Sequence, residues 1–243
     1  LCSKVIIATG GLSYPTTGST GDGFAWASAL GHHIVPTFPS LTALVPKGYK
    51  IKETEDIRHS RADADDRFHI DRSTPLSEFG EKLCGIQMKN VGLSLYVQDN
   101  LVDTDQGDVD FTDGGIEGPL GFRMSRKAVK SIVNGSKVSL VMDLKPGVTL
   151  TEITERVKTL WKEVDKDPRS ARLREKEKCR ILLGKLMPWD LIPAFVEMHR
   201  EIYTLERRSR TETKLWINLV SIAKALKVWR FDIAGYVGYE RAV

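Results

Sequence analysis

The sequence opens with a segment that is typical of a packed α/β arrangement. Residues 4–8 (KVIIA) form a short, mostly apolar and β-branched run, which is typical of a buried strand in a parallel sheet. After a loop, residues 22–30 carry the apolar residues of a helix. Thr20 or Ser19 can cap the start of this helix, and Gly31 can end it. The pattern predicts half of an α/β unit, whose partner strands we expect to lie outside this chain.

The middle of the chain favours a small β unit. Apolar residues alternate with polar or small ones from Val91 to Val97, which is the period of a half-buried strand. Asp99-Asn100 is a plausible hairpin turn leading into Leu101–Val102, and a helix is expected from Pro119 to Asn134-Gly135. Further strands are expected at Gly107–Thr112 and Val138–Leu144, and an extended segment at Leu41–Val45.

The character becomes helical after Pro146. Ile153, Val157 and Leu160 belong to one amphipathic stripe, which predicts a helix. Further helices are expected near 172–187, 189–202 and 212–226, and strand-like composition returns at Val228–Ile233 and Tyr236–Val243. The charged stretch 51–80 shows little periodicity, so we interpret it as a long loop or a weakly ordered insertion.

Charge and cysteine content narrow the classes of protein. The net charge of +4 is the sum of −2 over residues 1–150 and +6 over residues 151–243. A basic second part could meet nucleic acid or an anionic cofactor, but acidic residues interleave there, which favours solvated helix faces. Three cysteines in no CxxC pair favour a reduced, cytoplasmic setting, and no apolar run reaches the ~18 residues of a membrane helix. Because the chain begins at Leu1, we expect it to be part of a longer protein.

Two glycine-rich segments are candidate ligand sites. Residues 9–23 (TGGLSYPTTGSTGDG) lie between the expected strand and helix. Glycine lets a ligand approach the main chain, and amides at a helix start attract negative charge. The loop contains neither GxGxxG nor GxxxxGK[ST], and an ordinary tight connection is the alternative. Residues 111–119 (FTDGGIEGP) are the second candidate, for which a capped helix entry is the alternative.

The sequence gives little support for a metal site or for a hydrolase active site. No pair of histidines has the spacing of a zinc site, and the aspartates between 63 and 71 lack the glycine and glutamate of a calcium loop, so we expect no metal. Gly-x-Ser-x-Gly does not occur and no Ser/His/Asp triad can be nominated, so no catalytic residue is assigned. Tyr14 could donate a proton, although a packing role is the alternative.

Residues 4–23 resemble the signature of the bacterial BaiN-like flavoproteins, FAD-dependent oxidoreductases whose relatives include aminoacetone-oxidase-like enzymes. The resemblance continues through residues 39–46 (PSLTALVP), 89–91 and FTDGGIEGP. It implies an α+β fold with a small barrel-like β unit and a helical unit, and with a remnant of a Rossmann-like α/β FAD domain at the two ends. The resulting parts are an FAD-domain fragment (1–48), a β-rich insert (49–148), a helical insert (149–227) and a strand returning towards the FAD domain (228–243).

The resemblance also implies a function for the parent protein. That function is hydride transfer through a flavin, with a small-molecule substrate and with NAD(P)H or oxygen as the other partner. The residues expected on the cofactor side are Thr9, Gly10, Gly11, Tyr14, Thr17 and Gly18. The upstream GxGxxG is absent, so we expect the isolated chain to retain little or no FAD, to show no turnover and to have the remainder of the FAD domain as its partner.

The sequence departs from the family pattern at two positions. The family usually has FTHxGxSGP, whereas Asp113 and Glu117 stand here in place of the histidine and the serine. Because of these two differences, it stays open whether the substrate or the activity is altered here. The role of the long charged stretch 51–80 is also open. The alternative functions are a nucleic-acid-binding module that uses the basic helices of 151–230, and a docking or dimerisation domain. We expect neither nucleic acid nor a membrane to be the partner.

Overall fold

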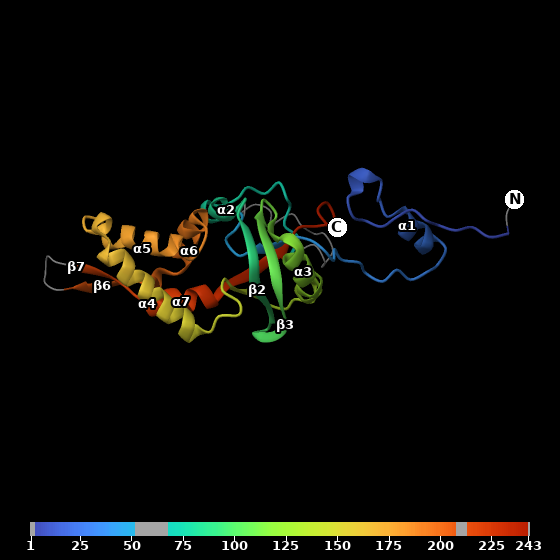
Figure 1. The fold of residues 1–243 in the computed structure, drawn as a ribbon. Helices are drawn as coiled ribbons and strands as arrows, with labels where there is room; N and C mark the ends of the chain where they lie inside the picture. The colour runs from blue at the N-terminus through green and yellow to red at the C-terminus, as the bar shows by residue number, and fades with distance from the viewer. Residues whose placement is uncertain (1–2, 52–67, 208–212, 243) are drawn as a thin grey trace.

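A closed antiparallel barrel stands at the centre of the molecule. The computed structural model describes residues 3–51, 68–207 and 213–242. Figure 1 shows the barrel between a helical unit and an extended N-terminal segment. The α+β class with a barrel and a helical unit, predicted from the sequence, is confirmed. Around the barrel the strands are β1 (Leu44–Pro46), β4 (Gly115–Glu117), β3 (Asn100–Thr112), β2 (Gln87–Val97), β5 (Val138–Asp143) and β8 (Trp229–Tyr236).

The β2–β3 hairpin is the longest element of the barrel. The expected alternation is confirmed, because Val91, Leu93 and Leu95 point into the core and are almost fully buried. The turn itself lies one residue earlier than predicted. Gln98 and Asp99 both have left-handed backbones, with φ of 50° and 61°, which matches the right-handed twist of the paired strands. The two short strands expected after the turn are one continuous strand, β3.

Helix α3 (Gly118–Val133) covers one side of the barrel. It begins beside Pro119 as predicted, and its buried stripe includes Leu120, Met124 and Ala128. Ser125 lies on the same stripe. Its hydroxyl donates to the carbonyl oxygen of Ser40 at 2.8 Å and accepts the amide N–H of Thr42 at 3.3 Å. These contacts fix the extended segment that leads into β1.

The helical unit follows β5. Helix α4 (Leu150–Lys166) has the predicted buried stripe, and its start carries a capping box between Thr149 and Glu152. It is followed by α5 (Glu175–Gly184), α6 (Ile192–Met198) and α7 (Leu219–Lys227). Within the described ranges, no helix combines the length and the apolar character that a membrane crossing needs.

One helix prediction is wrong. Residues 212–226 do not form a single helix, because β7 (Thr213–Ile217) pairs with β6 (Tyr203–Arg207) before α7 begins. The two strands form a hairpin, and β7 packs against α5. The hairpin supplies hydrogen-bond partners that a helical pattern in the isolated sequence does not reveal. In the stretch 51–80, α2 (Glu78–Leu83) is helical, and residues 52–67 lie outside the described residues.

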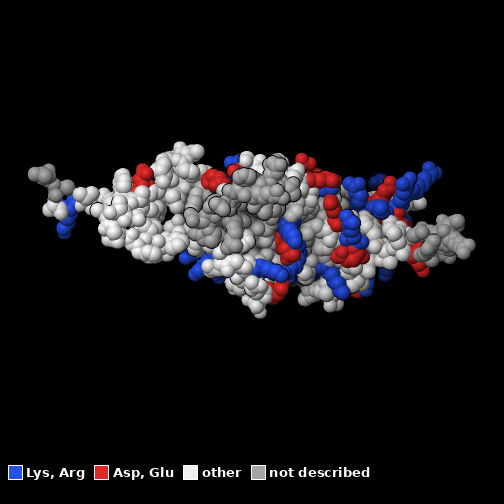
Figure 2. All heavy atoms as spheres, turned by 180° about the vertical axis from the view of Figure 1, so that it is seen from behind, with Lys and Arg blue, Asp and Glu red and all other residues white. Residues whose placement is uncertain are grey.

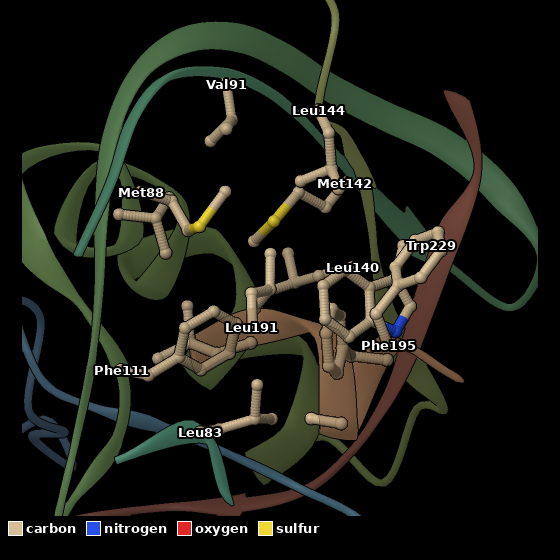
Figure 3. Close-up of a cluster of buried hydrophobic side chains, with 14 of the residues drawn as sticks. Leu83, Met88, Val91, Phe111, Leu140, Met142, Leu144, Leu191, Phe195 and Trp229 are labelled. Atoms are coloured by element: carbon tan, nitrogen blue, oxygen red, sulfur yellow. The ribbon is translucent and has the colours of Figure 1, made fainter. Parts of the chain in front are cut away.

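The barrel and the helical unit share one hydrophobic core. Figure 3 shows Leu191 and Phe195, from the helical unit, among barrel residues such as Leu140 and Trp229. The rings of Phe195 and Trp229 meet edge to face with centroids 5.4 Å apart. Burial of large apolar side chains on both sides joins the two units into one packed body.

The N-terminal segment extends away from this body (Figure 1). Its helix is α1 (Asp22–Ala29), close to the predicted range, but Gly21 occupies the cap position instead of Thr20 or Ser19. As predicted, Gly31 ends the helix, with a φ of 88°.

The strand predicted at residues 4–8 is not present. These residues are extended but pair with no strand among the described residues, and Val5 and Ile6 are 77% and 91% exposed. A parallel strand is stable only when neighbouring strands take its hydrogen bonds. The strand prediction depended on partner strands expected outside this chain, and the described residues do not supply them.

Candidate functional site

The FTDGGIEGP segment forms a tight turn at one end of the barrel. It carries the chain from β3 through β4 into α3. Gly115 has a φ of 126°, and a Cβ there would collide with the carbonyl oxygen of Leu44 in β1. Glu117 occupies the cap position of α3. The segment is therefore a helix entry, and it also places two carboxylates, Asp113 and Glu117, at the barrel end.

These two carboxylates join two arginines in an ion network. Arg241 binds both oxygens of Glu117, at 2.7 Å and 3.0 Å, and its third nitrogen lies 2.9 Å from Asp113. Arg72 donates to the other oxygen of Asp113 at 2.9 Å. We call Arg72, Asp113, Glu117 and Arg241 the barrel-end ion network. Its centre is shielded from solvent, since the Glu117 side chain is 8% exposed and the Arg241 side chain 18%.

The network sets the protonation of its surroundings. Burial raises the pKa of Asp113, but the hydrogen bond from Arg72 and the charge of Arg241 outweigh burial and hold that pKa below its ordinary value. Burial raises the pKa of Tyr49, as do the negative charges of Asp113 and Glu117. The Tyr49 hydroxyl donates to the carbonyl oxygen of Thr112 at 2.7 Å, so a neutral phenol stands beside the paired charges.

Lys50 is a buried cation at the same end of the barrel. Its ammonium group donates to the carbonyl oxygens of Asp71 and Arg72, at 3.2 Å and 2.7 Å. Burial lowers the pKa of Lys50, and the charges of Asp113 and Asp71 oppose that shift. Main-chain carbonyls therefore solvate an ammonium group that water barely reaches.

Residues 237–242, which we call the C-terminal segment, cross this end of the barrel. The amide of Val237 donates to the carbonyl oxygen of Ala43 at 3.0 Å. Glu240 lies 3.0 Å from the His69 ring nitrogen, and Arg241 belongs to the ion network. The carbonyl oxygen of Tyr239 accepts the amide of Tyr14 at 2.9 Å. The segment thus connects the barrel end to residues 9–23, which we call the glycine loop.

The glycine loop has a tightly turned main chain. Gly10 and Gly18 have left-handed backbones, with φ of 76° and 101°, and Tyr14 shares that region at 51°. A short 3-10 helix (Pro15–Thr17) follows Tyr14, and the Thr17 hydroxyl donates to the Tyr14 carbonyl oxygen at 2.7 Å. All six residues predicted on the cofactor side, Thr9, Gly10, Gly11, Tyr14, Thr17 and Gly18, lie on this one loop.

Part of the loop presents bare main chain. A Cβ built at Gly11 or Gly18 would meet no atom within 4 Å. Among the described residues, no group accepts a hydrogen bond from the amide N–H of Gly10 or Gly11. Open amides without neighbouring side chains can receive the polar or planar part of a coenzyme, so this loop fits a nucleotide coenzyme.

Sequence reasoning missed most of the barrel-end ion network. It singled out Asp113 and Glu117 only as departures from a family pattern. Arg241 stands 124 and 128 positions along the chain from the two acids, and Arg72 stands 41 positions from Asp113. No local motif marks either arginine, because their partners come together only when the barrel closes.

The rest of the described structure offers few other candidate sites. Over the described residues, no group of three or more His, Cys, Asp or Glu side chains is arranged to hold a metal ion. Cys84 and Cys179 are free thiols. Figure 2 shows basic and acidic side chains interleaved over the barrel and the helical unit. Pairs such as Lys178–Asp165, at 2.6 Å, and Lys185–Glu163, at 3.3 Å, account for part of that pattern.

Comparisons with known proteins agree with the architecture. The family model described as "HI0933-like protein barrel and H2TH domain" matches residues 70–243. Among curated proteins, the 3-dehydro-bile acid delta(4,6)-reductase of Clostridium scindens is 24% identical over 195 residues. The aligned part covers 80% of this chain but 38% of the reductase, so the chain spans well under half the length of that relative.

Proposed function

This chain belongs to the HI0933-like family, and on that premise we propose that it forms the substrate-side region of an FAD-dependent oxidoreductase. The resemblance to BaiN-like flavoproteins, drawn from the glycine loop and from FTDGGIEGP, is confirmed at the level of the family. A reductase among the relatives supports redox chemistry for the parent protein. FAD as the specific flavin, NAD(P)H as electron donor and a small-molecule substrate are parts of the proposal.

The observation that carries the proposal is the state of the N-terminal segment. From residue 5 to residue 46 the chain has a single Asp, Glu, Lys or Arg residue, Asp22. In the same stretch large apolar side chains face solvent, among them Ile6, Trp26 at 52% exposure and Leu30 at 73%. A soluble protein rarely exposes such a continuous apolar surface unless a partner covers it. We assign that role to the remainder of the FAD domain, whose sheet would take residues 4–8 as a strand.

The chemistry divides between the coenzyme and this chain. When bound, the flavin would supply the hydride transfer, and the protein would supply binding, orientation and electrostatics. Gly10, Gly11 and Gly18 would let the loop main chain lie against the coenzyme, because no side chain stands in the way at Gly11 or Gly18. Tyr14 would hold the loop to the barrel end through its bond to Tyr239.

The barrel end would form the neighbouring wall of the substrate site. Asp113 and Glu117 are ion-paired and Tyr49 donates to a main-chain carbonyl, so these groups have assigned partners in the described structure. No side chain is assigned as the proton donor. The reduced, cytoplasmic setting expected from the cysteines belongs to the same proposal.

A visible absorption spectrum tests the proposed function. The complete natural protein is expected to show flavin bands near ~450 nm as purified or after addition of FAD. The 243-residue chain alone is expected to stay colourless and without turnover, because it lacks the pyrophosphate-binding fingerprint. A complete, folded protein that takes up no flavin would contradict the proposal.

The alternative functions gain less support. A nucleic-acid-binding surface requires unpaired cations gathered on one face, whereas Lys158, Lys178 and Lys185 of the helical unit each lie beside a carboxylate. The exposed N-terminal segment is compatible with a docking role, and we interpret the docked partner as the rest of the same enzyme.

A further inference from the structure

The glycine loop has few contacts of its own. None of residues 9–23 is buried. Its internal hydrogen bonds are local, such as the amide of Gly18 to the carbonyl oxygen of Pro15 at 3.0 Å. Within the described part of the chain, the bond from the Tyr14 amide to the Tyr239 carbonyl oxygen is the one hydrogen bond between the loop and the barrel end. The position of the loop therefore depends on what holds Tyr239.

Tyr239 lies in the C-terminal segment, and contacts among the described residues hold this segment on both sides of Tyr239. Before Tyr239, Val237 is held by main-chain and side-chain bonds to Ala43 and Thr42. After Tyr239, the anchors are Glu240 on His69 and Arg241 in the barrel-end ion network. Arg241 makes three hydrogen bonds to two carboxylates. It is less exposed than Asp113 but more exposed than Glu117.

The network is built in a way that fixes Arg241 in one orientation. A guanidinium group is planar, and here one edge meets both oxygens of Glu117 while another nitrogen meets Asp113. Asp113 is itself held from the other side by Arg72. Removal of Arg241 would leave the carboxylate of Glu117 shielded from water and without its ion-pair partner, which is energetically costly. The ion pair therefore stabilises the observed position of the C-terminal segment.

We propose that Arg241 is a positioning residue, which through Tyr239 and Tyr14 holds the glycine loop at the coenzyme side of the barrel end. Asp113 and Glu117, the two departures from the family pattern, then act on Arg241 as its counter-ions. The link to a coenzyme rests on the proposed function. The mechanical link between Arg241 and the loop rests only on the contacts of this chain.

Hydrogen exchange in the complete natural protein, freed of flavin, tests the mechanical link. Arg241→Gln is expected to speed exchange of the Tyr14 amide by about tenfold or more, because that amide exchanges when the local bond opens. Arg241→Lys keeps the charge but lacks the planar guanidinium that meets both carboxylates at once, and it is expected to give an intermediate rate. Arg230→Gln is the matched control, since Arg230 also pairs with two carboxylates, Asp99 and Asp232, away from this network.

Flavin affinity in the same variants is the second measurement. Arg241→Gln is expected to weaken FAD binding by about tenfold or more, and Arg230→Gln to leave it unchanged. Should Arg241→Gln fail to fold, Asp113→Ala replaces it, because Asp113 is the more exposed acid and its loss removes only one of the three Arg241 bonds.

The outcomes distinguish the positioning role of Arg241 from the proposed flavin-dependent function. An unchanged Tyr14 exchange rate in Arg241→Gln, or an equal change in Arg230→Gln, would overturn the positioning role. A faster Tyr14 exchange in a protein that takes up no flavin would support the positioning role and contradict the proposed function. Because melting temperature is recorded for each variant, a general loss of stability is distinguished from local release of the loop.

Discussion

At the scale of single residues, the most constrained side chains are buried polar and charged ones, because burial leaves them only the partners that the fold supplies. Glu117 accepts a hydrogen bond from Arg241, and Lys50 is solvated by main-chain carbonyls. His199 is a different case. Its Nδ1 lies 3.2 Å from a carboxylate oxygen of Glu201, whereas its buried Nε2 has no hydrogen-bond partner among the described residues. The ring packs against Phe195, with centroids 4.7 Å apart.

His199 is expected to make stability depend on pH. Burial lowers the pKa of His199 from its ordinary value of 6.5, although Glu201 opposes the shift. Below pH 6.5 the unfolded chain binds a proton that the folded chain resists, so the free energy of unfolding falls as the pH drops. Above that pH this contribution is constant. Denaturant unfolding between pH 8 and about pH 5.5 measures the effect.

The histidine prediction has a simple control. His199→Gln is expected to flatten the pH dependence in that window, because glutamine does not titrate. His33→Gln removes an exposed histidine and is expected to leave the dependence as it is. A wild-type protein whose stability is constant from pH 8 to about pH 5.5 would contradict the prediction.

Gly11 allows a direct residue-scale test of the open main chain. Gly11→Val places its side chain in empty space, so we expect the chain to fold normally. In the complete protein the added side chain would occupy the space of the coenzyme. Such a steric clash costs about 1–3 kcal/mol of binding free energy, so FAD binding is expected to weaken by about tenfold or more. Fluorescence titration with FAD measures this. Thr20→Val, at an exposed position of the same loop, is the control, and equal affinities for both variants would contradict the prediction.

At the scale of elements, some helices and strands are determined mainly by the local sequence and others mainly by tertiary contacts. Helix α4 is locally determined, since its capping box and its buried stripe are both visible in the sequence. Strand β7 is determined by its antiparallel partner β6. Trp216 of β7 donates its indole N–H to Glu206 of β6 at 2.7 Å, a cross-strand contact that no helical arrangement would make.

The capping box of α4 is expected to contribute measurably to stability. Thr149→Ala removes the hydroxyl that accepts the amide of Glu152, and loss of a helix cap typically costs about 1 kcal/mol. Thermal or denaturant unfolding measures the change. Thr159→Ala, in the exposed middle of the same helix, is the control and is expected to change stability much less. Equal effects of the two substitutions would show that the cap has no special role.

At the scale of the whole molecule, the chain divides into a packed body and an N-terminal segment. The barrel and the helical unit are one body because they share a core (Figure 3). Residues 3–37 include no buried residue, and they expose apolar side chains that no described residue covers. Their conformation in the complete protein is therefore expected to depend on contacts outside this chain.

Truncation tests this division. A chain that starts at Phe38 is expected to keep the melting temperature of the 243-residue chain within a few degrees, because truncation removes no core side chain. It is also expected to be more soluble, since exposed apolar surface is lost. Removal of residues 228–243 is the contrasting truncation, because it deletes β8 and opens the barrel. Loss of cooperative unfolding in the chain that starts at Phe38 would contradict the prediction.

The sequence by itself determined those features whose physical cause is local. The alternation in β2, the stripe of α4, the entry of α3 at Pro119 and the stop of α1 at Gly31 all depend on neighbours within a few residues. The resemblance of the glycine loop to a flavoprotein signature was equally local, and the family was confirmed by comparison. The cofactor roles of the six loop residues stay a prediction.

Only the tertiary structure decided which distant segments meet. Residues 4–8 have the composition of a strand but no neighbouring strand in the described structure, whereas β8 closes a barrel by pairing with β1 and β5. Arg241 finds Asp113 and Glu117 for the same reason. Hydrogen bonds between strands and ion pairs between distant side chains form only when closure of the chain brings both partners together, and sequence pattern carries no record of that meeting.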